Sequence, residues 1–226
     1  MKNQVSAAQA IGHVKSGMSI MLSGFFSTGS PVGLIRELMN HDATDLTVIA
    51  NDAASEFMNP NAIGTELIRT GKIKKLICSY SGHNPAAQEY AAKGALEIET
   101  IPMGTFVERI RAGGAGLGGF LTPTGLGTEV EKGKRIIQVQ GCDYLLEEPL
   151  RADIALLYSN MADEDGNINL RGNLKNFAIV MATAADFVIV ETREIAKNPI
   201  DPDLVNIPAP LVDAIVLIDG GGKHEK

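Results

Sequence analysis

The segment that decides the fold is Met18-Ser-Ile-Met-Leu-Ser-Gly-Phe-Phe-Ser-Thr-Gly-Ser-Pro31, which runs from an apolar stretch through a small turn to a helix signal. Residues 18–22 are typical of a buried strand, and Ser30-Pro31 is an N-cap residue followed by proline at the first helical position. The glycines permit a tight strand-to-helix turn. A helix N-terminus reached in this way can also bind an anion, although no Lys or Arg follows the turn before Arg36. The turn therefore has either a mechanical or a chemical role.

Strand and helix signals continue to alternate along the rest of the chain. Short apolar or β-branched runs predict strands at residues 18–22, 46–51, 73–79, 96–101, 135–139, 144–147, 153–158 and 187–191. Helices are predicted after Ser30-Pro31, after Asn84-Pro85, after a capping box of Thr105 with Glu108, and over residues 174–185. This order predicts an α/β fold, an open and mostly parallel sheet wrapped by helices, with residues 135–147 as a small antiparallel hairpin around Gly141.

Composition and charge limit the domain organisation and the function classes. The 226 residues are 45% hydrophobic and 21% charged, which is typical of a soluble globular chain. We expect one domain over residues 1–219 and a flexible tail over 220–226, Gly-Gly-Gly-Lys-His-Glu-Lys. A net charge of −7 disfavours nucleic-acid binding. A membrane span is disfavoured because no apolar run reaches about 18 residues.

The two cysteines, Cys78 and Cys142, lie far apart and have no partner motif. They therefore indicate neither a disulfide framework nor a metal site. Such a cysteine pattern fits a reducing compartment, and we expect a cytoplasmic protein.

A second glycine-rich segment covers residues 112–128 and contains a G-x-G-x-x-G pattern in Gly114, Gly116 and Gly119. A dinucleotide fingerprint must follow a strand and open a helix, whereas here a helix signal precedes the glycines and Pro123 follows them. Neither glycine-rich loop ends in the Gly-Lys-Ser/Thr of a phosphate loop. Because unstructured loops of this length are usually functional, the segment is still a candidate site.

Four loops begin where predicted strands end, near Ser23, Asn51, Tyr80 and Met103. The carboxyl ends of parallel strands lie at one edge of a sheet, which is where open α/β folds bind ligands. Of the four histidines, only His83 lies in such a loop. We expect these loops to converge, although turns and helix caps alone would also explain them.

Residues 16–31 resemble the signature of the first subunit of family I coenzyme A transferases. Ser16-Gly17 is followed by an apolar run, by Ser23-Gly24-Phe25 and by Gly29-Ser-Pro31; Ser16 and Ser23 depart from the residues usual there. The resemblance spans roughly residues 5–218 and continues through the segments 46–52, 104–128, 150–155, 166–167 and 175–177. It is strongest to the alpha subunits of acetate or butyrate:acetoacetate CoA-transferases.

The resemblance implies an enzyme that moves coenzyme A between a short-chain acyl-CoA and a carboxylic acid of the acetate, butyrate or acetoacetate type. Family members form an acyl-glutamyl anhydride and then a glutamyl-CoA thioester, and their catalytic glutamate belongs to a second, beta subunit. Nothing in this chain matches that glutamate motif. We therefore expect no catalytic glutamate here, a hetero-oligomer with a beta subunit, and no cofactor besides the coenzyme A thioester that serves as substrate.

The resemblance also implies site residues. The expected substrate-binding residues are Gly24, Phe25, Phe26, Gly29, Asn51, Tyr80, Asn84, Gly116, Gly118 and Gly119. Met103 stands where relatives carry a glutamine that stabilises an oxyanion, and methionine offers only its backbone N–H. Either the oxyanion hole here uses backbone donors alone, with a contribution from Met103 and Gly104, or this enzyme handles a different acyl group. Asp52 is expected to oppose an incoming carboxylate unless it is neutralised.

Two other function classes stay open on the residues alone. An effector-binding regulatory module would explain the lack of a nucleophile in the chain. A sugar-phosphate isomerase would need its own acid and base near a glycine-rich loop. Co-purification of a second chain of similar size would favour the transferase over both.

Overall fold

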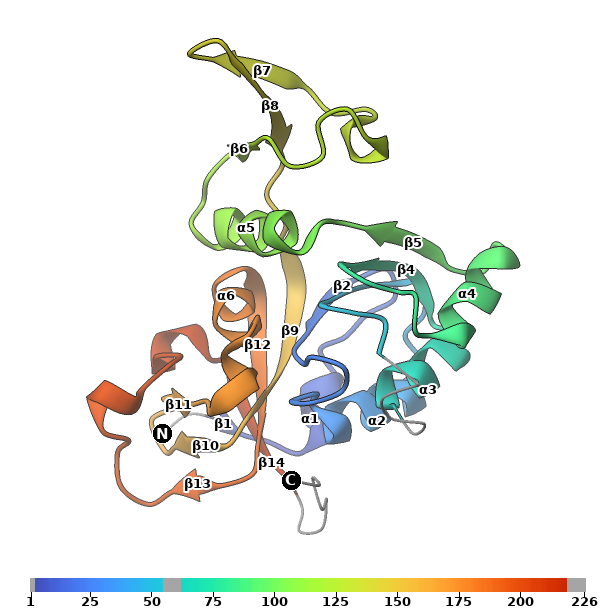
Figure 1. Cartoon of the computed structure of the whole chain (residues 1–226). Coiled ribbons are helices and arrows are strands. Elements are labelled where there is room, and N and C mark those ends of the chain that lie inside the picture. The colour runs from blue at the N-terminus through green and yellow to red at the C-terminus, as the bar shows by residue number, and fades with distance from the viewer. Residues whose placement is uncertain (1–2, 55–61, 219–226) are drawn as a thin grey trace.

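A computed structural model describes residues 3–54 and 62–218 of the chain. Eight strands form the central sheet in the order β1-β14-β12-β9-β2-β3-β4-β5, and every neighbouring pair is parallel (Figure 1). These strands are β1 (Asn3–Gln4), β2 (Ser19–Leu22), β3 (Leu46–Ala50), β4 (Ile73–Cys78), β5 (Glu97–Thr100), β9 (Ala152–Ser159), β12 (Ala185–Thr192) and β14 (Ala214–Leu217). The helices are α1 (Ala7–Ile11), α2 (Val32–Asn40), α3 (Ile63–Arg69), α4 (Pro85–Ala92), α5 (Met103–Gly114) and α6 (Ala178–Thr183).

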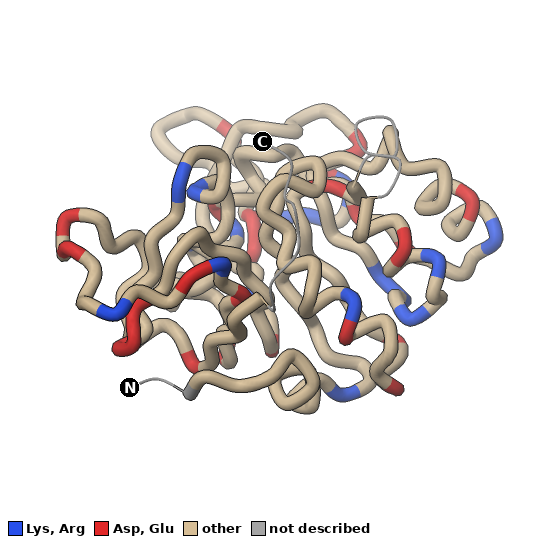
Figure 2. Tube along the Cα trace, turned by 90° about the horizontal axis from the view of Figure 1, so that it is seen from below, with Lys and Arg blue, Asp and Glu red and all other residues tan. Residues whose placement is uncertain are grey.

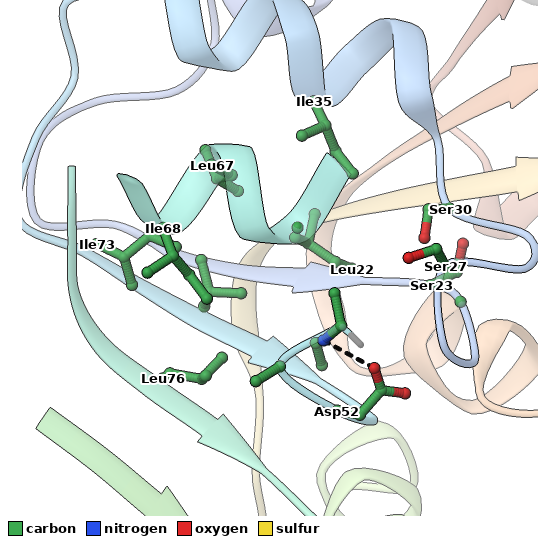
Figure 3. A pocket seen from close by; sticks show the side chains of 16 residues that line it. Leu22, Ser23, Ser27, Ser30, Ile35, Asp52, Leu67, Ile68, Ile73 and Leu76 are labelled. Carbon is green, nitrogen blue, oxygen red and sulfur yellow. Dashed lines mark hydrogen bonds between the residues drawn. The ribbon is translucent and has the colours of Figure 1, made fainter. Parts of the chain in front are cut away.

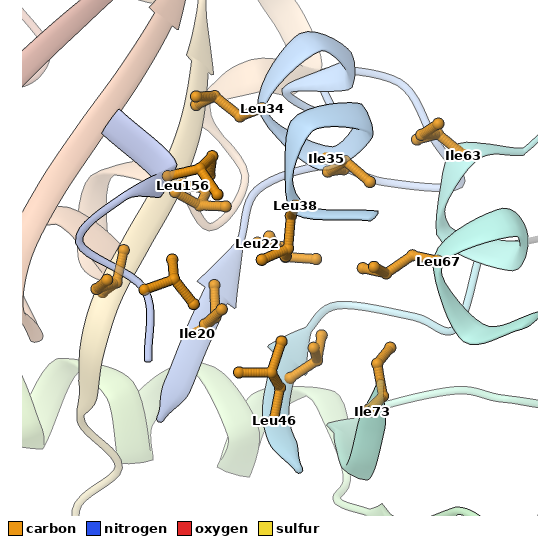
Figure 4. Packing of buried hydrophobic residues seen from close by; sticks show 14 of the residues in the cluster. Ile20, Leu22, Leu34, Ile35, Leu38, Leu46, Ile63, Leu67, Ile73 and Leu156 are labelled. Atoms are coloured by element: carbon orange, nitrogen blue, oxygen red, sulfur yellow. The ribbon is translucent and has the colours of Figure 1, made fainter. Parts of the chain in front are cut away.

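Two hydrophobic cores cover the two faces of this sheet, because successive side chains of a strand point to opposite faces. On one face, Ile20 and Leu22 of β2 pack with α1, α2, α3 and α4 (Figure 4). On the other face, Met21 packs with α5 and α6. With both faces covered, inner strands such as β2, β9 and β12 are largely apolar, which is why their runs are readable in the sequence. The edge strand β5 instead alternates Ile98 with Glu97 and Glu99.

Two smaller sheets flank the central one. The strands β6 (Phe120–Thr122), β7 (Ile136–Val139) and β8 (Cys142–Glu147) form an antiparallel sheet that projects from the body above α5 (Figure 1). The strands β10 (Met161–Asp163), β11 (Ile168–Asn169) and β13 (Ile195–Ala196) form the other. Short 3-10 helices complete the described elements: η1 (Glu129–Glu131), η2 (Gly172–Lys175), η3 (Pro202–Leu204) and η4 (Ala209–Leu211).

The predicted fold class is confirmed, and all eight predicted strands are present. The hairpin turns at Gln140 and Gly141, which both have positive φ, 50° and 78°, as a two-residue turn between antiparallel strands requires. Asn84 caps α4 as predicted, because its side chain accepts the N–H of Ala87 at 3.0 Å.

Three helix predictions are corrected. The N-cap of α2 is Pro31 rather than Ser30, and no side chain caps it. The capping box of Thr105 and Glu108 is wrong: α5 begins two residues earlier, after Pro102, so Thr105 lies inside the helix and Glu108 pairs with Arg111. A continuous helix over 174–185 is also wrong, since only 178–183 is α-helical and residue 185 already begins β12.

The predicted domain of residues 1–219 and the predicted tail of 220–226 meet outside the part of the chain that the structure describes. Within the described part, Lys and Arg alternate with Asp and Glu around the molecule and gather into no basic face in the view of Figure 2. None of the described helices is long and apolar enough to cross a bilayer.

Candidate active site

Three of the four loops expected to converge meet at the carboxyl edge of the central sheet. The backbone N–H of Phe26, in the loop after β2, donates to Oδ2 of Asp52 after β3 at 2.9 Å. Asp52 forms a parallel bridge with Tyr80 after β4, and the N–H of Ala53 donates to the carbonyl of Tyr80 at 3.0 Å. Strands β2, β3 and β4 are neighbours, so their order in the sheet brings these loops together.

Four side chains of these loops form what we call the ring cluster: Phe25, Phe26, Tyr80 and His83. The ring of Phe26 lies 4.8 Å from Phe25, 6.3 Å from Tyr80 and 6.4 Å from His83, measured between centroids, and Tyr80 lies 5.0 Å from His83. Tyr80 is 39% exposed although it is large and apolar. The ring cluster therefore presents an aromatic surface to solvent at the edge where α/β sheets bind ligands.

The backbone around the ring cluster is strained. Phe26, Ser27 and Ala54 have positive φ values of 45°, 71° and 65°, a region that side chains with a Cβ avoid. Such conformations persist only when their surroundings hold them, and they gather at functional sites. Here the carboxylate of Asp52 holds both segments, since it accepts the N–H of Phe26 and, at 2.8 Å through Oδ1, the N–H of Ala54.

The amide of Asn51 also donates to Asp52, at 2.7 Å. Three N–H donors thus stabilise the Asp52 carboxylate but leave its negative charge in place, so its opposition to an incoming carboxylate stays a prediction. Asn51 itself is 1% exposed. Its side chain therefore supports Asp52 in this structure, and its direct contact with substrate stays a prediction.

Asn84 is completely buried, and both the nitrogen and the oxygen of its side-chain amide form hydrogen bonds. Its Nδ2 donates to the carbonyl of Ala53 and, at 2.9 Å, to Oγ1 of Thr65, while its Oδ1 caps α4. Asn84 thus fixes the segment after β3 beneath the ring cluster. A substrate contact by this side chain would require it to leave these bonds.

Gly24 and Gly29 are required by packing within the turn. An added Cβ on Gly24 would come within 2.6 Å of Ser30 Oγ, and one on Gly29 within 2.2 Å of Cδ2 of Leu174. Both residues also have positive φ, 133° and 77°. Gly29 therefore lets the turn pack directly on η2, which follows β11 in the chain.

This packing creates a groove of about 400 Å³ between Phe25 and η2, lined by Phe25, Gly172, Asn173, Lys175 and Asn176. Lys175 is exposed and makes no ion pair within the described residues. Sequence reasoning missed these residues as site residues and found no cation near the turn before Arg36. Their signal was weak: residues 175–177 belong to the resembling segments, but nothing local places Lys175 opposite Phe25.

Met103 and Gly104 form the exposed first turn of α5, at the carboxyl end of β5. Phe106 makes the first helical bond, to the carbonyl of Pro102 at 2.8 Å, so the N–H groups before it have no helical partner. Met103 is 47% exposed, and a Cβ on Gly104 would meet no atom within 4 Å. The space beside these N–H groups is therefore open to a ligand atom.

Gly116, Gly118 and Gly119 lie past the opposite end of α5. The helix has 12 residues, so about 18 Å of helix separates them from Met103. Gly119 instead packs at the base of the projecting antiparallel sheet, where an added Cβ would come within 2.6 Å of the carbonyl of Glu147. The structure does not bring these three glycines to the ring cluster, and their role in binding stays a prediction.

The N-terminus of α2, which the turn could have offered to an anion, is occupied by the chain's own carboxylate. Glu191, at the end of β12, is 1% exposed and accepts the N–H of Leu34 at 2.7 Å through Oε2. Burial raises the pKa of Glu191 above its usual range, although the N–H groups of Leu34 and Gly33 oppose this. The turn therefore works through its side chains and its packing rather than as an anion cradle.

Comparison with known proteins identifies the family. The family model described as Coenzyme A transferase matches residues 4–217. This chain belongs to the coenzyme A transferase family. It is 45% identical over 203 residues to the acetoacetyl-CoA:acetate/butyrate CoA transferase alpha subunit of Clostridium acetobutylicum, covering 89% of this chain and 91% of that one. It is 41% identical over 219 residues to the acetate CoA-transferase subunit alpha of Escherichia coli K12, covering 96% and 98%.

A solved structure agrees at the level of the fold. The acyl-CoA transferase of Escherichia coli O157:H7, in a thioester complex with CoA, superposes with a TM-score of 0.83 at 20% identity, covering 96% of this chain and 47% of that one. The two relatives from Clostridium acetobutylicum and Escherichia coli K12 are both named as alpha subunits, so this chain is an alpha-type subunit of a CoA-transferase. In residues 3–54 and 62–218, no group of three His, Cys, Asp or Glu side chains is placed to hold a metal ion.

Proposed function

We propose that this chain is the alpha subunit of a heteromeric enzyme that transfers coenzyme A between a short-chain acyl-CoA and a carboxylic acid of the acetate, butyrate or acetoacetate type. The observation that carries the proposal is that Phe25, one ring of the ring cluster, lines the same groove as Lys175. An aromatic wall suits the apolar arm of coenzyme A. An ammonium group suits the carboxylate or phosphate groups of the two substrates.

The covalent steps are assigned to the partner. A glutamate of a beta subunit attacks the acyl-CoA carbonyl and displaces the coenzyme A thiolate, which gives an acyl-glutamyl anhydride. The thiolate then attacks the glutamyl carbonyl of the anhydride, which releases the carboxylate and leaves a glutamyl-CoA thioester. The second acid reverses these steps. This chain supplies donors for the developing oxyanion from the open first turn of α5, at Met103 and Gly104. No cofactor other than coenzyme A is invoked.

Exposed apolar side chains support the proposal that this chain binds a partner subunit. Large hydrophobic residues that are at least 39% exposed include Tyr80 and Met103 at the carboxyl edge, and Leu121, Ile136 and Val139 on the projecting antiparallel sheet (Figure 1). Such surface favours burial in an interface. We propose that the beta subunit closes the carboxyl edge and completes the site. A cytoplasmic location stays a prediction.

The proposal is tested by assaying the purified chain alone, a candidate beta subunit alone, and the two together. Acetyl-CoA or butyryl-CoA serves as donor, and acetate, butyrate or acetoacetate as acceptor. We expect transfer only from the combined chains, which should co-purify. Transfer by this chain alone would contradict the division of labour, and the absence of transfer with every pair would contradict the assigned substrates.

A further inference from the structure

The turn after β2, residues 23–31, lies over a cavity between the sheet and helices α2 and α3. The cavity has a volume of about 50 Å³, and Ser23, Ser27 and Ser30 of the turn lie together at one end of it (Figure 3). Atoms that line a void lack packing partners on that side. The turn also holds Phe26 and Ser27 at positive φ, 45° and 71°. Its conformation therefore depends on contacts at its sides and ends.

Two sets of contacts hold the start and the middle of the turn. The hydroxyl of Ser23 accepts the N–H of Tyr158 in β9 at 2.9 Å and donates to the carbonyl of Gly29 at 2.9 Å. The carboxylate of Asp52 accepts the N–H of Phe26 at 2.9 Å. Neither set reaches the point where the turn enters α2.

The end of the turn is held by Glu191 of β12. Helix α2 begins after Pro31, which provides no side-chain cap. Oε2 of Glu191 accepts the N–H of Leu34 at 2.7 Å, although the two residues are 157 positions apart in the chain. A carboxylate in this place stabilises the unpaired N–H groups of a helix N-terminus. Glu191 lies opposite Tyr158 in the pairing of β12 with β9, so two neighbouring strand ends hold both ends of the turn.

Gly33 gives the carboxylate room to approach α2. A Cβ added to Gly33 would lie 2.9 Å from Oε2 of Glu191, and the other nearest atoms also belong to Glu191. Gly33 is exposed, and glycine weakens a helix relative to alanine. The approach of Glu191 is therefore the contact that requires a glycine here.

We propose that Glu191 is a positioning residue of the active site, which fixes the start of α2 and thereby holds Phe25 and Phe26 in the ring cluster for the acyl-CoA. Glu191 acts through the turn and does not touch the substrate. The inference rests on the proposed function, which assigns the ring cluster to the apolar arm of coenzyme A. Positive φ at residues with a Cβ persists only when the surroundings impose it. Loss of the contact at α2 therefore lets Phe26 and Ser27 relax and displaces the rings.

The test uses the complex of this chain with its beta subunit and compares Glu191→Ala with Glu191→Gln. Asp163→Ala is the matched control. Asp163 is as buried as Glu191, 1% exposed, and it accepts the backbone N–H groups of Asn167 at 2.8 Å and Ile200 at 3.0 Å, which lie outside the turn and α2. For each variant we measure stability, kcat, KM for the acyl-CoA, and amide hydrogen exchange of peptides that cover residues 23–31.

We expect Glu191→Ala to raise KM for the acyl-CoA about tenfold and to change kcat less than about twofold, since lost binding common to the ground state and the transition state acts on KM. Hydrogen exchange over residues 23–31 should become at least about tenfold faster. Glu191→Gln should keep the wild-type KM and exchange, because its amide oxygen still accepts the N–H of Leu34. Asp163→Ala should lose stability and change neither. Equal KM and equal exchange in the two alanine variants would overturn the inference.

Gly33→Ala tests the same contact from the helix side and replaces Glu191→Ala if that variant does not fold. The new Cβ displaces the carboxylate, so KM and the exchange of residues 23–31 should both rise about threefold or more. Wild-type KM and wild-type exchange in Gly33→Ala would then overturn the inference.

A failure of the proposed function would look different. In that case the wild-type complex would transfer no coenzyme A, and the exchange measurements alone would decide the role of Glu191. Faster exchange of residues 23–31 in Glu191→Ala, but not in Asp163→Ala, would uphold the positioning of the turn. Equal exchange in both variants would refute it.

Discussion

The carboxylate of Asp52 accepts the backbone N–H of Phe26 at 2.9 Å and thereby joins the turn after β2 to the loop after β3. The same carboxylate accepts the N–H of Ala54 and the amide of Asn51. One side chain thus holds two residues of positive φ, Phe26 and Ala54, in place. The position of Phe26 in the ring cluster rests on this connection.

Asp52→Ala should lower both stability and activity. It leaves three donors without their acceptor, and an unsatisfied buried donor costs about 1–3 kcal/mol. We expect a loss of about 3 kcal/mol in the free energy of unfolding and a fall of about tenfold or more in kcat/KM.

The matched control is Asp153→Ala. Asp153 accepts the N–H and the hydroxyl of Ser19 at 2.7 and 2.6 Å, at the opposite edge of the sheet. This variant should lose stability and keep the kinetics of the wild type. Chemical denaturation and steady-state kinetics on both variants make the comparison; equal kinetic losses would show that Asp52 acts only through stability.

Gly29→Ala should displace η2. The new Cβ would lie within 2.2 Å of Leu174, at a φ of 77°. Gly17→Ala is the control, because Gly17 has a similar φ of 83° but nothing within 4 Å of a new Cβ. We expect about 1 kcal/mol of destabilisation in Gly17→Ala and at least about 2 kcal/mol more in Gly29→Ala.

The double variant Gly29→Ala/Leu174→Ala separates the clash from the strain. If the clash dominates, thermal unfolding should show the double variant to be more stable than the sum of the two single changes predicts. Additive losses would mean that Leu174 does not transmit the effect.

Lys175→Gln should weaken substrate binding without unfolding the chain. The side chain is exposed in the groove beside Phe25, so its removal takes away an attraction for anionic substrate groups. We expect KM for the acyl-CoA to rise about tenfold and to lose much of its dependence on salt. Lys93→Gln, which removes a surface partner of Glu89, is the control. A KM that rises equally in both variants would contradict a role for Lys175.

Glu191→Gln should make stability less dependent on pH. Burial raises the pKa of Glu191 above 4.5 in the folded chain, so its contribution to stability is complete below pH 4.5 and is lost as the pH rises through the folded pKa. Glutamine is neutral throughout and still offers an oxygen to the N–H of Leu34. The free energy of unfolding of the variant relative to the wild type should therefore increase with pH above 4.5. A difference that falls over that range would contradict the assignment.

The sequence predicts the sheet well because its inner strands are largely apolar. It predicts the helix ends less well. The pair Thr105 and Glu108 has the spacing of a capping box, yet Pro102 starts α5 earlier. The true capping box, Ser6 with Gln9 at α1, was present in the sequence and was missed, as was strand β14.

The candidate site likewise has one part that the sequence could predict and one part that it could not. The convergence of the loops at Phe26, Asp52 and Tyr80 follows from the order of the strands and could be expected. The groove at Lys175 could not, because it depends on Gly29 packing against Leu174, a contact between residues 145 positions apart in the chain. The commitment of Asn84 to internal hydrogen bonds likewise depends on tertiary structure.

The central claim, that this chain is the half of the enzyme without the catalytic glutamate, is tested most directly by locating the covalent intermediate. The complex is mixed with an acyl-CoA, the thioester is trapped by borohydride reduction, and both chains are digested and analysed by mass spectrometry. We predict one reduced glutamate, in the beta subunit. A reduced glutamate in this chain, whether at exposed Glu108 or buried Glu191, would contradict the claim.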